Sequence, residues 1–269
     1  MAERSIEEGT GLFGPDSVIW RVNRETVVAL AGTCATLMQI AHPAVAAGVR
    51  DHSQYDVDLA GRLRRTMDLT MAMVFGSDHT AERAARVINA RHREVRGQGY
   101  SALDPQLLLW VQATLVYAAV RAYPALVGPL SAADGDAYYQ DTKTIGVLLG
   151  VPAAIYPRNL DALETYMAAM IESGPVRVGG DARRIARLLL YPRFRGVPPI
   201  AFAPVRTLTA GFLPARLREA YGLAWTPGQQ RAFRVYCRLS RRLIPLVPGP
   251  VRHMPRARQA YRRLRLQPA

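Results

Sequence analysis

The run of residues 25–41 constrains the fold most, because it is apolar on nearly every side of a helical projection. Apolar side chains on all faces can be buried only if other elements surround the helix, so the run predicts a central helix packed all round. His42 and Pro43 follow it, and proline disfavours a helical conformation in the residue before it. We therefore expect this helix to end at Ala41, inside a shell of further helices.

Other segments repeat apolar residues at helical spacing. Residues 59–75 follow Asp58, which can cap a helix, and precede Gly76, and residues 80–95 precede Gly97, a natural C-cap. Further helices are predicted at residues 105–122, 134–149, 160–173, 181–190, 215–221, 227–244 and 256–264. Alternating β-branched runs between tight turns are almost absent. The sequence therefore predicts an all-α fold, a single globular domain of about eight to ten helices.

Charge is distributed unevenly along the chain. The net charge is +14, but residues 1–150 hold 14 basic and 16 acidic side chains and residues 151–269 hold 21 basic and 5 acidic ones. No acidic residue follows Glu219, whereas eleven arginines do. We expect an N-terminal extension over residues 1–14, a helical domain over residues 15–225, and a basic helical segment over residues 226–269 packed on the same domain.

Three features predict where the protein resides. The N-terminus is acidic and lacks the basic and apolar regions of a secretory signal. The most apolar long stretch, residues 107–120, is too short to cross a bilayer. Cys34 and Cys237 fit neither a metal finger nor a disulfide framework, and we expect two reduced thiols. A cytoplasmic protein that does not span a membrane is expected.

His92 is the most informative candidate for chemistry, since the common glycine-rich, nucleophile and zinc motifs are absent. It follows Ile88 by one turn and precedes Val95 by three residues, which directs its imidazole toward the core side of a helix. A buried neutral imidazole needs a partner at both ring nitrogens. A metal with a backbone carbonyl satisfies this need, and so do two groups of the protein.

Arg62 and Thr66 are four residues apart and share one strip of the helix predicted over residues 59–75. This strip borders the apolar stripe, while Arg65 lies on the far, polar side. An arginine beside a buried face extends to water or pairs with an anion inside the protein. Extension to water is the commoner arrangement for a lone arginine, but the hydroxyl of Thr66 on the same strip weakens that interpretation, so both alternatives stay open.

The remaining histidines have simpler interpretations. His42 ends the central helix and is expected to cap it or to form a hydrogen bond there. His52 with Asp56 and Asp58 offers only one good nitrogen ligand, and this argues against a non-haem metal centre. His79 is expected to be an exposed turn residue, and His253 lies in the basic tail, without an assigned function.

The chain contains an ordered set of short motifs over roughly residues 15 to 225: Arg24-Glu25, Gln39-Ile40-Ala41-His42-Pro43, His52-Ser53, Arg62 with Thr66, Phe75-Gly76, His92 with Val95 and Gly97, Tyr100 with Leu103-Asp104-Pro105, Trp110-Val111, and Tyr139 through Gly150 with Pro152 and Pro157. Taken in order, these motifs resemble those of the family of MpaB-type oxygenases and latex-clearing proteins.

The resemblance implies an all-helical protein around a buried haem pocket. Members bind haem b, and the studied ones cleave carbon–carbon double bonds of isoprenoid chains with dioxygen as co-substrate. By position, His92 would be the iron ligand, and Arg62 and Thr66 would bind the cofactor and act in catalysis, Arg62 at a haem propionate and Thr66 near the haem edge. A pocket for a lipophilic, unsaturated substrate would then be lined by apolar residues of two predicted helices: Leu37, Met38, Leu63, Met67, Met71 and Val74.

Two departures from the family pattern argue against rubber as the substrate. Rubber-cleaving members have a lysine next to the threonine, where this chain has Arg65, which stays protonated and is a poor iron ligand. They also have a glutamate proposed as the base, whereas no glutamate occurs here between Glu25 and Glu82.

The sequence thus supports a haem-dependent oxygenase of lipophilic small molecules. The alternative is a non-enzymatic helical protein that attaches to an anionic membrane surface or to nucleic acid through the basic segment. Eleven arginines between residues 231 and 266 are interspersed with apolar side chains, a pattern compatible with a helix in the membrane interface. No recognition motif supports nucleic acid, so peripheral membrane attachment is the partner prediction that we retain.

Overall fold

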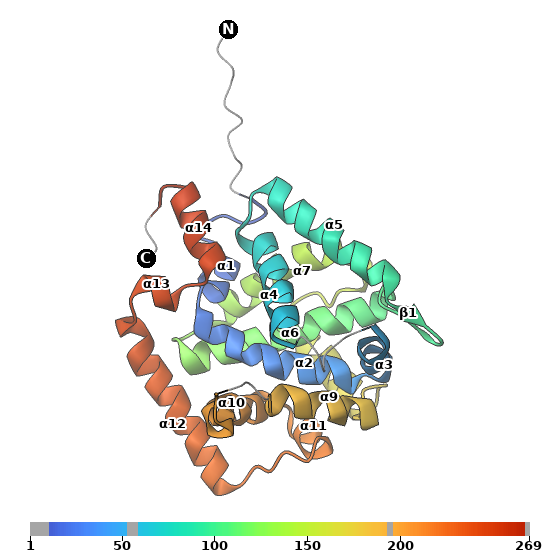
Figure 1. Ribbon diagram of the computed structural model, residues 1–269. Coiled ribbons are helices and arrows are strands. Elements are labelled where there is room, and N and C mark those ends of the chain that lie inside the picture. The colour runs from blue at the N-terminus through green and yellow to red at the C-terminus, as the bar shows by residue number, and fades with distance from the viewer. Residues whose placement is uncertain (1–10, 53–58, 193–195, 267–269) are drawn as a thin grey trace.

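A computed structural model describes residues 11–52, 59–192 and 196–266 of the chain, and its architecture is almost entirely helical (Figure 1). Its α-helices are α1 (Val18–Asn23), α2 (Gly32–Ala41), α3 (Pro43–His52), α4 (Leu59–Phe75), α5 (Asp78–Glu94), α6 (Pro105–Leu126), α7 (Ala132–Leu148), α8 (Leu160–Glu172), α9 (Gly180–Leu190), α10 (Ala203–Phe212), α11 (Ala215–Ala220), α12 (Pro227–Leu243), α13 (Gly249–Arg252) and α14 (Pro255–Arg263). The all-α prediction is confirmed.

Short 3₁₀ helices and one hairpin complete the described structure. The 3₁₀ helices are η1 (Thr26–Ala31), η2 (Ala153–Ile155), η3 (Pro199–Phe202) and η4 (Ile244–Leu246). In the described residues the β-structure consists of the two-residue strands β1 (Arg96–Gly97) and β2 (Tyr100–Ser101), which pair antiparallel, and one isolated bridge.

The apolar run at residues 25–41 forms the centre of the molecule, as predicted, but in two parts. It begins as η1 and continues as α2, where Leu37 and Met38 are fully buried. His42, in an extended conformation before Pro43, ends α2. Pro43 then starts α3, since proline is tolerated at the first position of a helix. This helix was not predicted.

Helix α6 packs against α2 and is the longest element. Asp104 caps it, since its Oδ1 accepts hydrogen bonds from the backbone N–H groups of Gln106 (2.8 Å) and Leu107 (3.3 Å). Polar contacts fix the register of the central pair, because Gln39 Nε2 donates to Thr114 Oγ1 at 3.1 Å. Burial of each large apolar side chain here contributes roughly 1.5–3 kcal/mol.

The predicted role of Gly97 as a helix cap was wrong. Helix α5 ends at Glu94 with Val95 as its C-cap, and Gly97 lies in β1. A Cβ at Gly97 would lie 2.6 Å from ring atoms of Tyr100, so this glycine lets the Tyr100 ring cross the hairpin closely. The hairpin in turn packs on α3, where Tyr100 donates to Asp51 at 2.7 Å.

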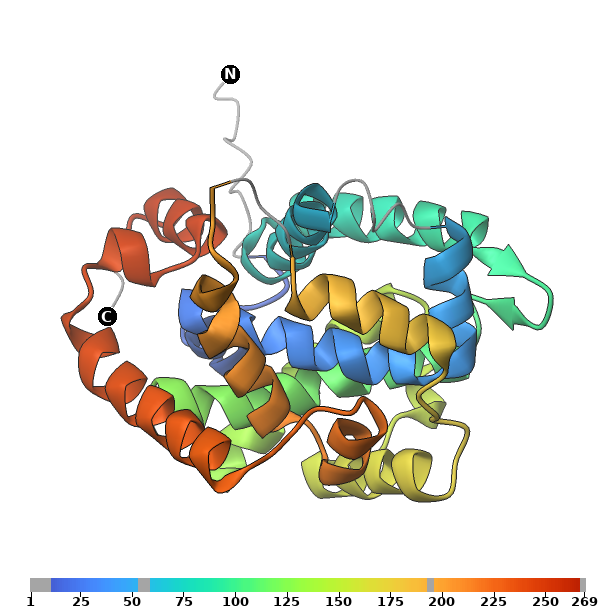
Figure 2. The same cartoon turned by 60° about the horizontal axis from the view of Figure 1, so that its bottom comes forward.

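The C-terminal helices follow one side of the molecule (Figure 2). Helix α12 begins with a capping box between Thr226 and Gln229 and packs on α6 and α10, whereas α14 packs on α4. Tyr261 of α14 makes an edge-on contact with Trp20, with ring centroids 5.5 Å apart. Both cysteines, Cys34 and Cys237, are buried free thiols, as expected.

Membrane-spanning potential was assessed on the described helices. None of them alone is long and apolar enough to cross a bilayer. The bent pair Thr26–Ala41 and Pro43–His52, with an angle of 104° between its two parts, meets the length and composition criteria only when taken together.

Candidate functional site

The candidate site residues lie on α4 and α5, which are joined by a tight turn. Ser77 caps α5 by accepting from the Thr80 N–H at 3.4 Å. Gly76 permits the close approach of the two helices, because a Cβ there would lie 2.7 Å from Cγ2 of Thr80 in α5. From this turn the helices run apart, α4 toward the centre of the molecule and α5 along its edge (Figure 1).

His92 lies two residues before the end of α5 and is half-buried. Its Nδ1 is buried and has no hydrogen-bond partner among the described residues. Burial lowers the pKa of His92 below its usual value, so the imidazole is neutral at pH 7. The inward direction predicted from the sequence therefore agrees with the structure, which places a neutral ring nitrogen in the protein with nothing bonded to it.

Asn89, one turn before His92, is a residue that the sequence analysis did not single out. Its Nδ2 donates to the Leu148 carbonyl at 3.1 Å and thereby ties α5 to the end of α7. Its Oδ1 is buried without a partner, like Nδ1 of His92. This face of α5 thus has two buried polar atoms without a described partner, three residues apart, whereas buried polar atoms are usually paired.

Thr66 and Arg65 are both solvent-exposed in α4. The Thr66 carbonyl accepts from the Thr70 hydroxyl at 2.9 Å, and no described hydrogen bond joins Thr66 to His92. The exposed position of Arg65 agrees with the polar side predicted for it. The Arg62 and Leu63 side chains lie outside the described residues, as do Asp56 and Asp58.

The apolar residues expected to line a substrate pocket are mostly core residues. Leu37, Met38, Met71 and Val74 are buried in the main hydrophobic core, and Met67 is half-buried against it. The described residues contain no group of three or more histidine, cysteine or acidic side chains that could hold a metal ion. A group that needs a single protein ligand is compatible with this arrangement. The buried haem pocket itself stays a prediction.

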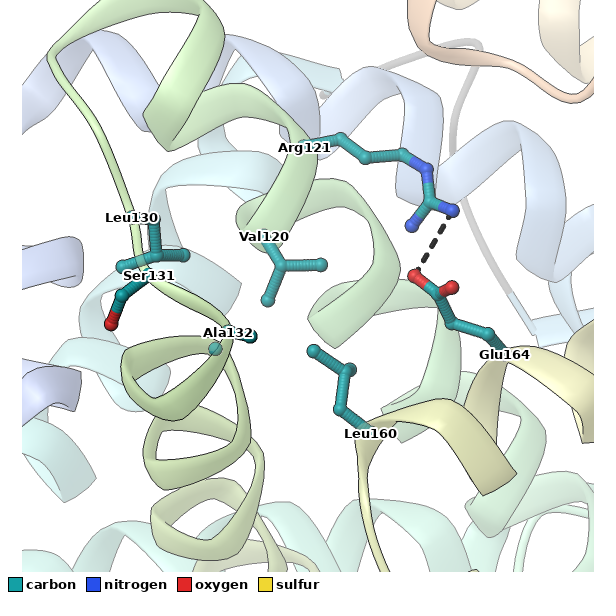
Figure 3. Close-up of a pocket in the computed structure, with 8 residues that line it drawn as sticks. Val120, Arg121, Leu130, Ser131, Ala132, Leu160 and Glu164 are labelled. Carbon is teal, nitrogen blue, oxygen red and sulfur yellow. Dashed lines mark ion pairs between the residues drawn. The ribbon is translucent and has the colours of Figure 1, made fainter.

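Two surface hollows are described, and neither is lined by His92 or Thr66. The first, of about 330 Å³, lies between α6, α7 and α8. Figure 3 shows Arg121 and Glu164 facing each other on one side of it, 3.2 Å apart, with Leu130 and Ser131 on the other side. The second, of about 350 Å³, is lined by residues of α9, α10 and α12 and of the segments that follow α9 and precede α12: Leu190, Tyr191, Ala203, Arg206, Thr207, Ala210, Gly222, Leu223, Ala224, Trp225 and Gln229.

Three histidines, His42, His79 and His52, cap a helix, lie exposed at the start of a helix, or form a hydrogen bond at the surface. His42 is the C-cap residue of α2, and its Nδ1 accepts from the Ala44 N–H at 3.2 Å. His79 is exposed at the start of α5. His52 is exposed, and its Nε2 lies 3.1 Å from the Arg96 carbonyl oxygen, so it links α3 to the hairpin.

His253 was expected to be an ordinary residue of the basic tail, but it is only 4% exposed. It lies beside Glu25, which is 1% exposed and accepts two hydrogen bonds from Arg252, each 2.8 Å long. Arg24 Nε is 3.5 Å and His253 Nε2 3.7 Å from Glu25 Oε1. We call these four residues, Arg24, Glu25, Arg252 and His253, the Glu25 cluster.

The Glu25 cluster joins the start of the chain to its end. The Met254 N–H donates to the Arg24 carbonyl at 2.8 Å, and Arg24 Nη1 lies 3.1 Å from the Tyr261 hydroxyl. The sequence signal for this cluster was Glu25 itself, the one charged residue of an apolar run. A buried carboxylate requires a counter-charge, but the sequence did not show which arginine would supply it.

Comparison with known proteins decides the family of the chain. Residues 20–242 match the family described as ER-bound oxygenase mpaB/B'/Rubber oxygenase, catalytic domain. The chain belongs to this family. His92, Arg62 and Thr66 all lie inside the matched region, as does most of α12.

Two curated relatives from mycobacteria are similar over most of their length. They are Uncharacterized protein Mb2261 of Mycobacterium bovis and Uncharacterized protein Rv2237 of Mycobacterium tuberculosis. Each is 30% identical over 234 residues, which cover 78% of this chain and 87% of the relative. No solved structure matches the chain. As a member of an oxygenase catalytic-domain family, the protein is assigned to the oxidoreductases at the level of the oxygenase class.

Proposed function

We propose that the protein is a haem b-dependent oxygenase in which His92 holds the iron. The observation that carries the proposal is the buried, unpartnered Nδ1 of a neutral imidazole on α5 of an oxygenase-family chain. A neutral histidine is a common haem ligand, and haem needs only one such residue from the protein. When bound, haem would supply the iron at which dioxygen is used.

Asn89 and Arg62 are the residues that would support His92 in this function. Asn89 fixes the end of α5 through the Leu148 carbonyl and so limits the positions that the His92 ring can adopt. Arg62 has the charge to pair with a propionate, and Thr66, one turn later on α4, has a hydroxyl that can donate or accept a hydrogen bond. These roles for Arg62 and Thr66 are part of the proposal.

The substrate that we propose is a lipophilic, unsaturated small molecule other than rubber. The family description names a rubber oxygenase, and rubber is an unsaturated hydrocarbon. In the proposed reaction one carbon–carbon double bond and one dioxygen molecule are consumed and two carbonyl groups form, so no external reductant is needed. Arg65 and the lack of a glutamate between Glu25 and Glu82 are the reasons to exclude the polymer.

Haem titration of the purified protein tests the proposal. The wild type is expected to bind one equivalent of haemin with a Soret band shifted from that of free haemin, and His92→Ala to lose at least nine-tenths of this binding. His79→Ala, an exposed histidine on the same helix, is the matched control and should titrate like the wild type. The proposal fails if the wild type binds no haemin, or if His92→Ala binds it with an unchanged spectrum.

A second titration tests the role of Arg62. Arg62→Ala is expected to weaken haemin binding several-fold while the spectrum of the bound form stays the same, because a propionate contact is lost and the iron ligand is kept. Arg64→Ala, at an exposed position of the same helix, serves as the control. Equal affinities of Arg62→Ala and Arg64→Ala would remove Arg62 from the site.

Oxygen uptake tests the substrate class. Haem-loaded protein with squalene in detergent is expected to consume dioxygen and to form carbonyl products, one dioxygen for each pair of carbonyls. The fully saturated analogue squalane should give no uptake. Equal uptake with squalane would contradict cleavage at a double bond, whatever the outcome of the haem titration.

A further inference from the structure

The outer face of α12 carries a row of aliphatic side chains that the fold does not use. Val235, Leu239 and Leu243 are spaced four residues apart, so they form one line along the helix. They are 42%, 47% and 54% exposed, and Leu246, just beyond the helix in η4, is 77% exposed. The row therefore continues past the end of the helix, and we call these four residues the aliphatic row.

The opposite face of α12 already provides its contacts with the protein. Cys237 is buried there, and Phe233 packs edge-on against Phe212 with ring centroids 5.3 Å apart. The Ser240 hydroxyl donates to the Leu126 carbonyl at 2.7 Å. Since successive residues are about 100° apart, the aliphatic row points away from these contacts. Helix α12 therefore has two apolar faces, one that packs on the protein and one that is exposed.

Arginines accompany the aliphatic row. Arg231, Arg238 and Arg242 lie on the neighbouring strip of α12, all are exposed, and none has an ion-pair partner among the described residues. No acidic residue occurs after Glu219 that could pair with them locally. The outer face of α12 is therefore apolar and positively charged together. It lies along one edge of the molecule, where other elements do not cover it (Figures 1 and 2).

We propose that the outer face of α12 docks on a membrane surface that contains anionic lipid. The aliphatic row would enter the boundary of the acyl chains, and the guanidinium groups would pair with lipid phosphates at the level of the headgroups. Each arginine near an anionic surface contributes to the free energy of membrane binding, and burial of a few apolar side chains supplies the remainder of that free energy. The inference goes beyond the proposed oxygenase function and does not require it.

Two other occupants fit this face less well. A second copy of the chain, related by a two-fold axis through this face, would bring the arginine strip against itself without any carboxylate between, and like charges repel. Nucleic acid would pair with the arginines but would leave the aliphatic row in water. An anionic lipid surface satisfies the charge and the apolar row at once.

Co-sedimentation of the full-length protein with vesicles tests the proposal. The probes are vesicles of phosphatidylcholine alone and of phosphatidylcholine with 30% phosphatidylglycerol. We expect the wild type to bind the anionic vesicles at least tenfold more strongly than the neutral ones. The triple variant Val235→Ser, Leu239→Ser and Leu243→Ser, and the double variant Arg238→Gln and Arg242→Gln, should each lose at least tenfold in binding to anionic vesicles.

Matched controls exclude a general effect of surface changes. Val147→Ser and Ile200→Ser remove exposed aliphatic side chains elsewhere, and Arg91→Gln removes an exposed arginine of α5. All three should bind vesicles like the wild type. Thermal melting of every variant checks the fold, and we expect the serine variants to melt near the wild type, because the residues replaced are exposed.

Several results would overturn the proposal. Equal binding to neutral and anionic vesicles, or wild-type binding by the serine triple variant, contradicts a combined apolar and charged contact. Binding to a duplex DNA that needs the arginines but not the aliphatic row, without vesicle binding, identifies a nucleic-acid interface instead. A dimer that becomes a monomer in the serine variant, without vesicle binding, identifies a contact between two copies.

Discussion

His92 and His253 are both largely withdrawn from water, but their surroundings differ in one respect. His253 lies among charged groups, with its Nε2 3.7 Å from Glu25 Oε1. Burial has the largest effect on its pKa and lowers it, Glu25 raises it, and Arg24, Arg252 and Arg258 lower it. For His92 burial lowers the pKa, and no charged group of the described residues contributes. Ring nitrogens of both histidines lack a described hydrogen-bond partner, but His253 has a carboxylate and arginines beside it, whereas His92 is buried without a charged neighbour among the described residues.

A structural histidine and a candidate ligand can be distinguished by the charged groups beside them. A histidine beside a paired carboxylate has a reason to be buried that lies within the fold. A buried imidazole with an unpartnered nitrogen and no charged neighbour lowers stability unless a bound group compensates. The following predictions test this contrast, from the largest expected effect to the smallest.

Removing the charge of Glu25 should have the largest effect on the protein. Glu25→Gln leaves Arg252 and Arg24 without their carboxylate, and breaking a buried pair from one side costs about 3 kcal/mol of unfolding free energy. Urea unfolding measures the loss. Glu172→Gln, which removes an exposed partner of Arg216, is the control and should change stability by less than about 1 kcal/mol. Equal effects would mean that the Glu25 cluster does not stabilise the fold.

Stability should depend on pH through both histidines. Burial lowers the pKa of His92 and His253 from the usual 6.5, so the unfolded state binds more protons than the folded state just below pH 6.5. Their contribution to stability is therefore complete above about pH 6.5 and is lost as the pH falls toward the folded-state pKa values. Each group adds a slope of at most about 1.4 kcal/mol per pH unit.

Urea unfolding at pH 5, 6 and 7 measures this slope. His92→Leu and His253→Leu should each make it flatter, while His79→Leu, at an exposed site, should leave it unchanged. An unchanged slope in both buried variants would show that neither imidazole loses its proton on folding in this range.

His92→Leu should stabilise the haem-free protein by about 1 kcal/mol at pH 7, because a buried unsatisfied nitrogen is replaced by an apolar group. The same variant should bind no haemin. A variant that is more stable but no longer binds the ligand is the result expected when a binding residue is replaced. A loss of stability would indicate that the His92 ring makes compensating contacts inside the protein and would weaken the contrast with His253.

The smallest effect is expected at the exposed pair between α14 and α4. Arg256 forms two hydrogen bonds to Asp68, of 2.8 and 2.7 Å, but the two side chains are 36% and 53% exposed. Asp68→Asn should cost about 0.5 kcal/mol and less at high salt. A cost as large as that of Glu25→Gln would show that α14 is held by this surface pair instead of by the buried cluster.

Much of the fold was predictable because its helices follow strong local signals. The helices predicted from residues 105 and 227 begin at those residues, as α6 and α12, each with proline at its first position. Helix α1 has only six residues, too few turns for a periodic pattern, and it was not predicted, whereas α11, of the same length, was predicted at residues 215–221 and is found at Ala215–Ala220. Gly97 was misassigned because the sequence does not show which ring will cross it.

The sequence predicted which way the His92 side chain points, but not which residues surround the candidate site. The spacing from Ile88 to Val95 predicted that His92 faces inward, and the structure agrees. A helical wheel gives the side of a helix but not what covers it, so the exposure of Thr66 did not follow from its place beside the apolar stripe. His253 was missed for the same reason, because its partner Glu25 is more than two hundred residues away in the chain.

The link between Glu25 and Arg252 has a consequence for the order of synthesis. Glu25 leaves the ribosome among the first residues of the domain, and its bidentate partner follows 227 residues later. Until then the nascent chain holds a carboxylate that its own apolar core cannot accept without a counter-ion. The Glu25 cluster is therefore completed only when Arg252 and His253 have emerged, so the buried carboxylate gains its bidentate partner late in synthesis.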